Sequence, residues 1–114
     1  MYKIDCKSCD KCYIGETGRD LNIRIKEHKY DVKKSKPESG IANHHIETGH
    51  KFNFSNARIV YPCNNKKNMR IVESSLIWYF TRQDRAVNLN YGFAPQNMLL
   101  SYYINNLLAG DINN

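Results

Sequence analysis

The sequence predicts an α+β domain in which a small three-stranded antiparallel sheet is flanked by helices. Large and polar residues alternate in residues 2–6 and again in residues 11–15, a pattern typical of two half-buried strands joined by a turn. Apolar residues recur at helical spacing from Leu21 and again from Met69, and a third strand is expected from Phe52 and Phe54 through residues 57–61. A few strands followed by several helices indicate one sheet with helices packed on it.

The first helix is expected from Leu21 to about Lys33. Asp20 precedes it, and aspartate is a favourable N-cap residue because its carboxylate accepts hydrogen bonds from the first turn. Arg24 and His28 are four residues apart and are therefore neighbours on one face of this helix.

The middle of the chain is expected to hold a short helix, a strand and a longer helix. The short helix lies within residues 41–50 and is stopped by Gly49, and Phe52 and Phe54 lead into the third strand. The longer helix is capped by Asn65 or Asn68. Its inward side chains are expected to be Met69, Val72, Leu76 and either Tyr79 or Phe80.

The expected domain covers residues 1–92, and residues 93–114 are expected to form a helical extension that packs on it. Within that extension, residues 98–108 are apolar enough for a last helix. No apolar run approaches the roughly 20 residues of a membrane span, and no signal-peptide pattern opens the chain. We therefore expect an intracellular protein without a membrane partner.

The chain is basic, with a net charge of +6 and a pI near 9.2. Such an excess attracts a phosphate backbone through counterion release, although a solvated basic surface explains the charge alone equally well. The residues expected to contact DNA lie in two groups, which are Lys33, Lys34 and Lys36, and Lys66, Lys67 and Arg70.

Cysteine and histidine pairs predict a structural zinc site. Cys6 and Cys9 form a Cys-x2-Cys pair, and His44 and His50 form a His-x5-His pair. Zn²⁺ takes four such ligands in a closed tetrahedral site. Two disulfides are the alternative in a secreted protein, but the paired spacing beside a histidine-rich segment favours a metal in a reducing compartment.

Two neighbouring residues are alternative ligands. His45 can replace His44, and Cys12 can replace a cysteine of the pair. Cys12 is a poor substitute, because it adjoins Tyr13 on a strand and should point to the opposite face from it. Cys63 is expected to be a plain thiol.

A further set of residues follows in order along the chain. Two tyrosines have ten residues between them, an arginine and a histidine follow on the first helix, and a glutamate and an asparagine come later; these are Tyr2, Tyr13, Arg24, His28, Glu73 and Asn90. In this order and spacing the set resembles the GIY-YIG nuclease family. More narrowly, the cysteine pair, residues 13–19, His44 and residues 47–50 resemble the endonuclease domain of Penelope-like retroelements, over roughly residues 2–92.

The resemblance implies the GIY-YIG nuclease fold and a metal-dependent DNA endonuclease that hydrolyses phosphodiester bonds. Tyr2 and Tyr13 would place two phenolic oxygens near one another, and the resemblance favours Tyr2 as the general base. Arg24 would bind phosphate oxygens, and His28 would orient a tyrosine or shuttle a proton. Glu73 is a hard oxygen ligand suited to Mg²⁺ or Mn²⁺.

Two positions leave more than one interpretation. Asn90, shortly before Gly92, fits the family better than Asn88, and Arg19 is either a phosphate contact or a brace for its loop. The Gly-Ile that precedes the first tyrosine in the family is absent before Tyr2, because Met1 begins the chain.

The resemblance also implies a biological setting. The nuclease would nick target DNA so that a reverse transcriptase domain of the same polypeptide can extend the exposed end, in the nucleus of a eukaryotic host. A stand-alone repair or homing nuclease of the same fold is the alternative within the enzyme class. A zinc-stabilised DNA-binding module without turnover is the alternative outside it.

Overall fold

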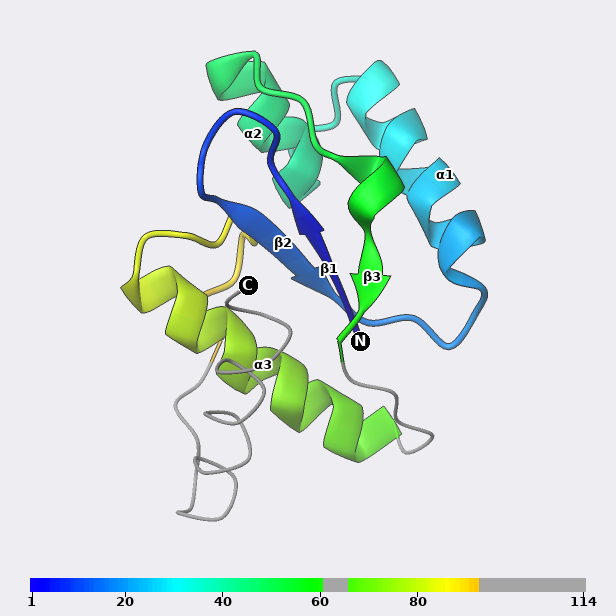
Figure 1. Ribbon diagram of the computed structural model, residues 1–114, viewed down its shortest axis with the longest axis vertical. Coiled ribbons are helices and arrows are strands. Elements are labelled where there is room, and N and C mark those ends of the chain that lie inside the picture. Colours follow the sequence, from blue (N-terminus) through cyan, green and yellow to red (C-terminus); the bar gives the residue numbers. More distant parts are fainter. Residues whose placement is uncertain (61–65, 93–114) are drawn as a thin grey trace.

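The computed structural model describes residues 1–60 and 66–92, without the side chains of residues 66 and 67. One antiparallel sheet has the strand order β2-β1-β3, formed by β1 (Tyr2–Asp5), β2 (Cys12–Gly15) and β3 (Arg58–Ile59). The helices are α1 (Leu21–Lys33), α2 (Gly40–Thr48), the short 3-10 helix η1 (Phe54–Asn56) and α3 (Lys66–Arg82). The helices α1 and α2 lie on one side of the sheet and α3 lies on the other (Figure 1). The predicted fold class is confirmed.

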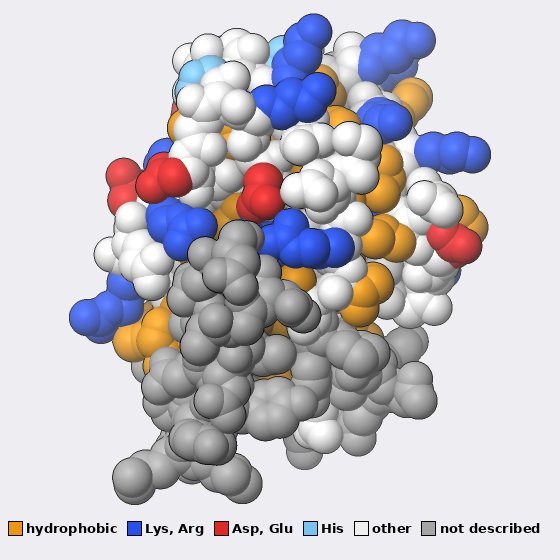
Figure 2. Space-filling view, in the orientation of Figure 1, with side chains coloured by type: hydrophobic (Ala, Val, Ile, Leu, Met, Phe, Trp, Pro, Cys, Tyr) orange, Lys and Arg blue, Asp and Glu red, His pale blue; other side chains and the backbone are white. Residues whose placement is uncertain are grey.

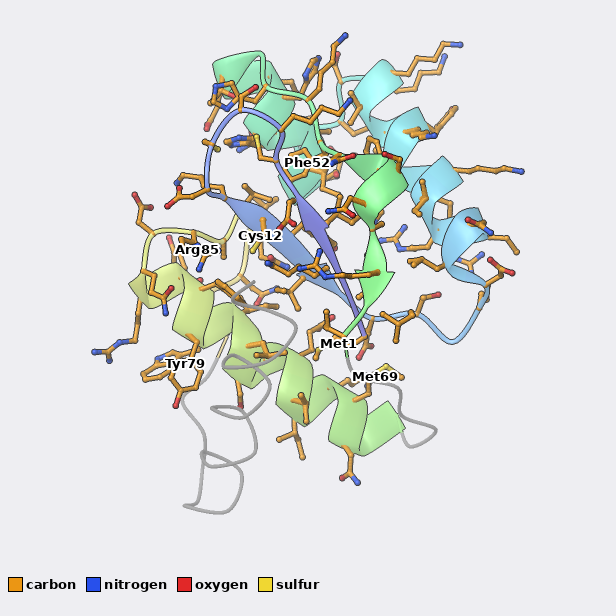
Figure 3. All side chains as sticks on the ribbon, viewed as in Figure 1. Met1, Cys12, Phe52, Met69, Tyr79 and Arg85 are labelled. Atoms are coloured by element: carbon orange, nitrogen blue, oxygen red, sulfur yellow. The ribbon has the colours of Figure 1, made fainter. Side chains whose placement is uncertain are left out.

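The alternation of the first two strands divides the core into two clusters. Tyr2 and Ile4 point toward α1 and α2 and are fully buried there, with Phe52 beside them. Cys12 and Ile14 point the other way, into a second cluster with the apolar side of α3. Figure 3 places Met1, Cys12 and Met69 between the sheet and α3, and Phe52 on the opposite side.

The first two helices begin and end where the sequence predicts. The side chain of Asp20 accepts a hydrogen bond from the backbone N–H of Asn22 at 2.8 Å, which caps α1. Gly49 follows α2 with φ of 75°, a left-handed conformation that glycine adopts without steric cost.

The third strand is shorter than predicted. Phe54–Asn56 forms the 3-10 helix η1, whose backbone groups bond within the turn, so the ladder with β1 is limited to Arg58 and Ile59. The first strand also ends one residue early, at Asp5. Cys6 instead forms a single bridge with Phe52.

The long helix buries the side that the sequence predicts. Met69, Val72, Leu76 and Phe80 are all buried against the sheet, and Tyr79 is partly buried. Because α3 already begins at Lys66, Asn68 lies inside the helix and is not its cap. Asn65, Cys63 and the predicted C-terminal extension lie outside the described residues.

Residues 85–88 run along the outer edge of β2, and we call this segment the edge segment. The backbone N–H of Cys12 donates to the Arg85 carbonyl at 2.7 Å, and the Val87 N–H donates to the Cys12 carbonyl at 2.9 Å. At Gly40, the first residue of α2, an added Cβ would lie 2.5 Å from the Val87 carbonyl oxygen. Glycine is therefore needed for α2 to approach the edge segment. Within the described residues, no helix is long and apolar enough to cross a membrane.

Candidate active site and metal centre

The two predicted tyrosines meet on the face of the sheet that α1 covers. Tyr2 on β1 is paired with Gly15 on β2, and its ring lies 6.2 Å from the ring of Tyr13, centroid to centroid. A Cβ at Gly15 would lie 2.5 Å from the Tyr2 hydroxyl oxygen and 2.9 Å from Cε2 of Tyr13. The glycine therefore makes room for both rings. This role follows from the pairing register, which the sequence alone does not give.

His28 is held against Tyr2. Its Nε2 lies 2.7 Å from the Tyr2 hydroxyl, and its side chain is buried on α1. Burial, together with the nearby charge of Arg24, lowers the pKa of His28 to about 4. The ring is therefore neutral at neutral pH, and one hydrogen bond joins its Nε2 to the tyrosine hydroxyl. The other ring nitrogen, Nδ1, is buried with no hydrogen-bond partner among the described residues.

The two tyrosines differ in their access to solvent. Tyr2 is 0% exposed, whereas Tyr13 is partly exposed. Burial raises the pKa of both hydroxyls, and Arg24, which lies within hydrogen-bonding reach of both, opposes that rise. Tyr13, Arg24 and His28 line one hollow of about 330 Å³. Tyr13 is thus the tyrosine that a molecule in this hollow can contact.

Glu73 approaches the same site from α3. Burial and the neighbouring carboxylate of Glu16 raise the pKa of Glu73 to about 7, and its charge acts on both Tyr2 and Tyr13. Glu16 directly follows Gly15, and its Oε2 is buried with no hydrogen-bond partner among the described residues. Glu16 belongs to the motif of residues 13–19, and the sequence alone assigned it no separate role. Its adjacency to the end of β2 was the available signal for a second carboxylate near Glu73.

A second hollow, of about 260 Å³, lies next to these carboxylates. Glu16, Arg19, Arg24 and Arg70 are among its lining residues, so Arg24 borders both hollows. The Arg70 guanidinium lies 3.5 Å from the other carboxylate oxygen of Glu16. The Arg19 guanidinium forms an ion pair with Glu27 on α1, which agrees with the interpretation of Arg19 as a loop brace.

The two candidate asparagines have different surroundings, although both line the 330 Å³ hollow. The Asn88 amide donates to the Ile14 carbonyl at 2.6 Å and accepts from the Ile14 N–H at 3.1 Å. Asn88 therefore holds the end of β2 in place beside Tyr13. Asn90, the residue that the family resemblance favours, is exposed and accepts a hydrogen bond from the backbone of Gly92.

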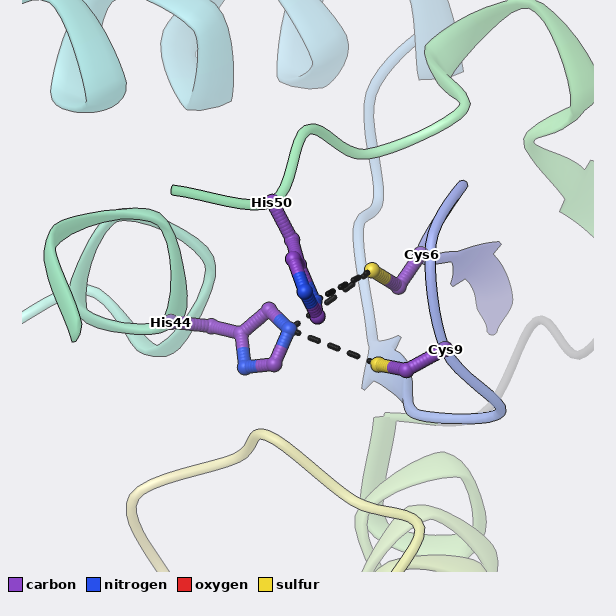
Figure 4. Close-up of side chains that lie close together, drawn as sticks. All are labelled: Cys6, Cys9, His44 and His50. Atoms are coloured by element: carbon purple, nitrogen blue, oxygen red, sulfur yellow. Dashed lines mark hydrogen bonds between the residues drawn. The ribbon is translucent and has the colours of Figure 1, made fainter. Parts of the chain in front are cut away.

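The cysteine and histidine pairs come together at the turn between β1 and β2. The ligand atoms of Cys6, Cys9, His44 and His50 all lie within 4.8 Å of one another, and these residues can hold a metal ion (Figure 4). The Cys6 sulfur lies 3.6 Å from Nε2 of His44 and 3.6 Å from Nδ1 of His50, and the Cys9 sulfur lies 3.6 Å from Nε2 of His44. We call these four residues the metal cluster.

The two alternative ligands point away from the metal cluster. Cys12 is buried between the sheet and α3, where burial raises the pKa of its thiol to about 11. It lies on the opposite face of β2 from Tyr13, as predicted. His45 bonds through Nδ1 to the backbone oxygen of His50 at 2.9 Å, so its contact with that segment is a hydrogen bond.

The basic residues predicted to contact DNA differ in their surroundings. Lys33 and Lys34 are exposed at the end of α1, and Lys36 lies 3.6 Å from Asp31. Residues 66 and 67 lie at the start of α3, and nothing is described of their side chains.

No protein-family model, no curated protein and no solved structure matches this chain. The function of these residues is therefore argued from their geometry and chemistry.

Proposed function

We propose that this protein is a metal-dependent DNA endonuclease of the GIY-YIG type, which hydrolyses phosphodiester bonds. One observation carries the proposal. Tyr13, Arg24 and His28 line a single open hollow, with Tyr2 bonded to His28 and Glu73 coupled electrostatically to the tyrosines. A hydroxyl, a guanidinium, a neutral imidazole and a nearby carboxylate can supply the proton transfer and charge stabilisation that phosphodiester hydrolysis uses.

Arg24 is suited to bind the scissile phosphate. Its guanidinium is always charged and offers a planar fork of donors that matches phosphate oxygens. It borders both hollows, so a phosphate between them meets this charge where the transition state gathers negative charge.

Tyr13 is the tyrosine that we assign to the attacking water. It is open to the hollow, whereas Tyr2 is fully buried and its hydroxyl is hydrogen-bonded to Nε2 of His28. We therefore assign Tyr2 and His28 a positioning role, although the family resemblance favours Tyr2 as the base. Burial raises the pKa of the Tyr13 hydroxyl, and Arg24 opposes that rise by favouring the phenolate, which is the form that can accept a proton from water.

Glu73 is the residue that we assign to a divalent cation such as Mg²⁺ or Mn²⁺. When bound, the cation would supply Lewis-acid stabilisation of a phosphate oxygen. The residues fit such a group, because Glu73 and Glu16 repel one another and one Glu16 oxygen is buried without a partner among the described residues. Oxygen ligands are also the ones that these cations prefer.

We propose zinc as the occupant of the metal cluster. Two sulfurs and two imidazole nitrogens are the donor set of a structural zinc site. Zinc bonds of about 2.3 Å to sulfur and about 2.0–2.1 Å to nitrogen, at tetrahedral angles, separate sulfur from nitrogen by about 3.6 Å. Three of the four sulfur–nitrogen pairs in the cluster are 3.6 Å apart. Zinc would tie the turn between β1 and β2 to α2 and the segment that follows it.

By the same resemblance, we propose that the nick serves a reverse transcriptase domain of the same polypeptide in a eukaryotic nucleus. Nicking with retention of a free 3′-hydroxyl is the part of this setting that the isolated chain can display. Extension of the nicked strand by an added polymerase measures it, and a blocked 3′ end argues against the setting.

The test of the proposed activity is a plasmid-nicking assay with and without Mg²⁺. The unmodified chain should convert supercoiled plasmid to the open circle only when the cation is present. Glu73→Gln keeps the size and polarity of the side chain but removes its charge, so nicking should collapse while DNA affinity stays nearly unchanged. Tyr13→Phe should also abolish nicking.

Glu38→Gln is a matched control, because Glu38 is an exposed carboxylate at the rim of the 330 Å³ hollow with no assigned role. If Glu73→Gln and Tyr13→Phe both nick at the unmodified rate, the hydrolytic mechanism is wrong. A chain that binds DNA without nicking it under any cation would instead be a zinc-stabilised binding module.

A further inference from the structure

A third hollow, of about 320 Å³, lies at the end of the molecule that carries the metal cluster. Its lining consists of three lysines, two histidines and three apolar residues, with no acidic residue among them. The lysines are Lys7, Lys29 and Lys51, and all three are exposed. Figure 2 shows basic side chains gathered over this end of the molecule, with the acidic side chains of that face lying further down.

Two of these lysines are fixed in place by the metal cluster. Lys7 directly follows Cys6, and Lys51 directly follows His50. The backbone N–H of Lys7 donates to the Lys51 carbonyl at 2.9 Å, so the two chain segments run side by side at this point. A metal ion that joins Cys6 to His50 would hold both lysines at one rim of the hollow.

The third lysine enters from α1. The Lys29 ammonium lies 5.7 Å from the ring centre of Phe54, which lines the hollow. Lys33 is four residues further along the helix and is therefore on the same side of it. Basic side chains thus flank the hollow from α1 and from the two segments that carry Cys6 and His50.

None of the three lysines forms an ion pair with a carboxylate among the described residues. Other lysines do, because Lys11 lies 3.1 Å from Asp84 and Lys36 lies 3.6 Å from Asp31. An ammonium without an internal counter-charge can pair with an external anion without first breaking a salt bridge. The charge around this hollow is therefore available to a polyanion.

We propose that Lys7, Lys29 and Lys51 form a docking surface for the phosphate backbone of double-stranded DNA, separate from the residues that cut it. The inference rests on the proposed nuclease function, because α1 connects this surface with the candidate active site. Arg24 and Lys29 are five residues apart on α1, which separates them by about 7.5 Å along the helix axis and by about 140° around it. The lysine surface therefore lies on a different side of α1 from Arg24, and its phosphate contacts add to that of Arg24 without overlapping it.

The test is fluorescence anisotropy of a labelled duplex over a series of salt concentrations, with the zinc-loaded full chain. The double variant Lys7→Gln, Lys51→Gln should bind about tenfold more weakly at low salt. The slope of log K against log salt should fall by about 1.8, because each lost phosphate contact removes about 0.9. The matched control is Lys11→Gln, Arg82→Gln, which removes the same charge from a paired lysine and from an arginine whose guanidinium lies 4.7 Å from the Trp78 ring.

The proposal is overturned if both double variants lose affinity equally, because the effect would then reflect total charge. It is also overturned if the lysine variant keeps its affinity, or if polyglutamate competes for the unmodified chain better than unlabelled duplex does. Plasmid nicking by the same proteins separates this proposal from the proposed function. Absence of nicking by the unmodified chain sinks the nuclease function, whereas the anisotropy comparison still decides the surface.

Discussion

The metal cluster and the tyrosine site are built in different ways on the same face of the sheet. The metal cluster takes its residues from two short pairs, with cysteines three positions apart and histidines six positions apart, and their donor atoms point at one another. The tyrosine site takes Tyr2 and Tyr13 from two strands and Arg24 and His28 from α1, and these groups are tuned by burial and by each other.

This difference in construction suggests that the metal cluster serves stability and that the tyrosine site serves chemistry. A metal ion in the metal cluster would supply binding energy directly, so the surroundings need only bring four ligands together. The tyrosine site keeps a neutral histidine and protonated tyrosines in a partly dry environment, which costs stability and is typical of a site that does chemistry. Loss of the metal should therefore affect folding, whereas changes in the tyrosine site should affect turnover or pH dependence.

Metal removal should have the largest effect. Chelation, or Cys9→Ser, should lower the melting temperature by more than about 10 °C, because metal binding energy of several kcal/mol is folding energy in a small domain. Metal analysis should find one zinc per unmodified chain and none in the variant. His45→Gln is the matched control, since His45 adjoins His44 but lies outside the cluster. A melting temperature indifferent to chelation would remove the stabilising role.

Arg24→Ala should reduce the nicking rate by about 100-fold or more, equivalent to about 3 kcal/mol of transition-state stabilisation. The physical reason is the loss of a charge between the two hollows. Single-turnover kinetics at saturating DNA measure it. Arg82→Ala removes a charge from the far end of α3 and should leave the rate unchanged. Equal nicking rates for Arg24→Ala and Arg82→Ala would mean that Arg24 does not stabilise the transition state.

The pH dependence of stability should report the buried histidine. The folded pKa of His28 is about 4, below the ordinary value of 6.5, so the unfolded chain binds a proton that the folded chain does not. Its contribution is therefore present above about pH 6.5 and is lost as the pH falls toward 4. Between pH 7 and pH 5 the free energy of unfolding should drop by about 2 kcal/mol from this group.

Urea unfolding of the unmodified chain and of His28→Gln at both pH values measures this contribution as a difference. Acid release of the metal affects both proteins alike and cancels. If His28→Gln keeps the full pH dependence, the histidine is protonated in the folded protein.

The two asparagines should give the smallest effects and should differ. Asn88→Ala removes two hydrogen bonds to Ile14 and leaves both of its backbone groups unpaired, which should cost about 1–2 kcal/mol. Asn90→Ala changes an exposed residue and should stay within about 0.5 kcal/mol. Denaturant midpoints measured in parallel distinguish the two. The reverse ranking would mean that the contact between Asn88 and β2 contributes little.

Local patterns predicted most of the secondary structure. Asp20 at the start of α1 and Gly49 after α2 act through backbone groups within a few residues, so the sequence alone predicts those helix ends. The predicted length of the third strand was wrong, because Phe54 is a residue type that favours strands but here begins a 3-10 helix. Whether such a segment pairs as a strand or forms a turn depends on the partner strand, and the sequence of the segment alone gives no information about that partner.

The candidate sites also differ in whether their partners are close in sequence or are brought together only by the fold. The metal cluster was predictable because its ligands are close in sequence within each pair. The room that Gly15 makes for Tyr2, and the contact of Asn88 with Ile14, depend on strand register and on a return of the chain over more than 70 positions. Glu16 was also missed as a neighbour of Glu73, because only folding brings the end of β2 to α3.

The edge segment also affects how molecules meet one another. Strands at the border of a sheet offer unpaired N–H and C=O groups to a second chain, and such borders are common starting points of aggregation. On β2 residues 85–88 already occupy part of these groups, and on the opposite border β3 is only two residues long. Within residues 1–60 and 66–92, neither border presents a long free strand to another copy. The edge segment, which brings Asn88 to the candidate active site, thus also hinders pairing of β2 with a strand of another molecule.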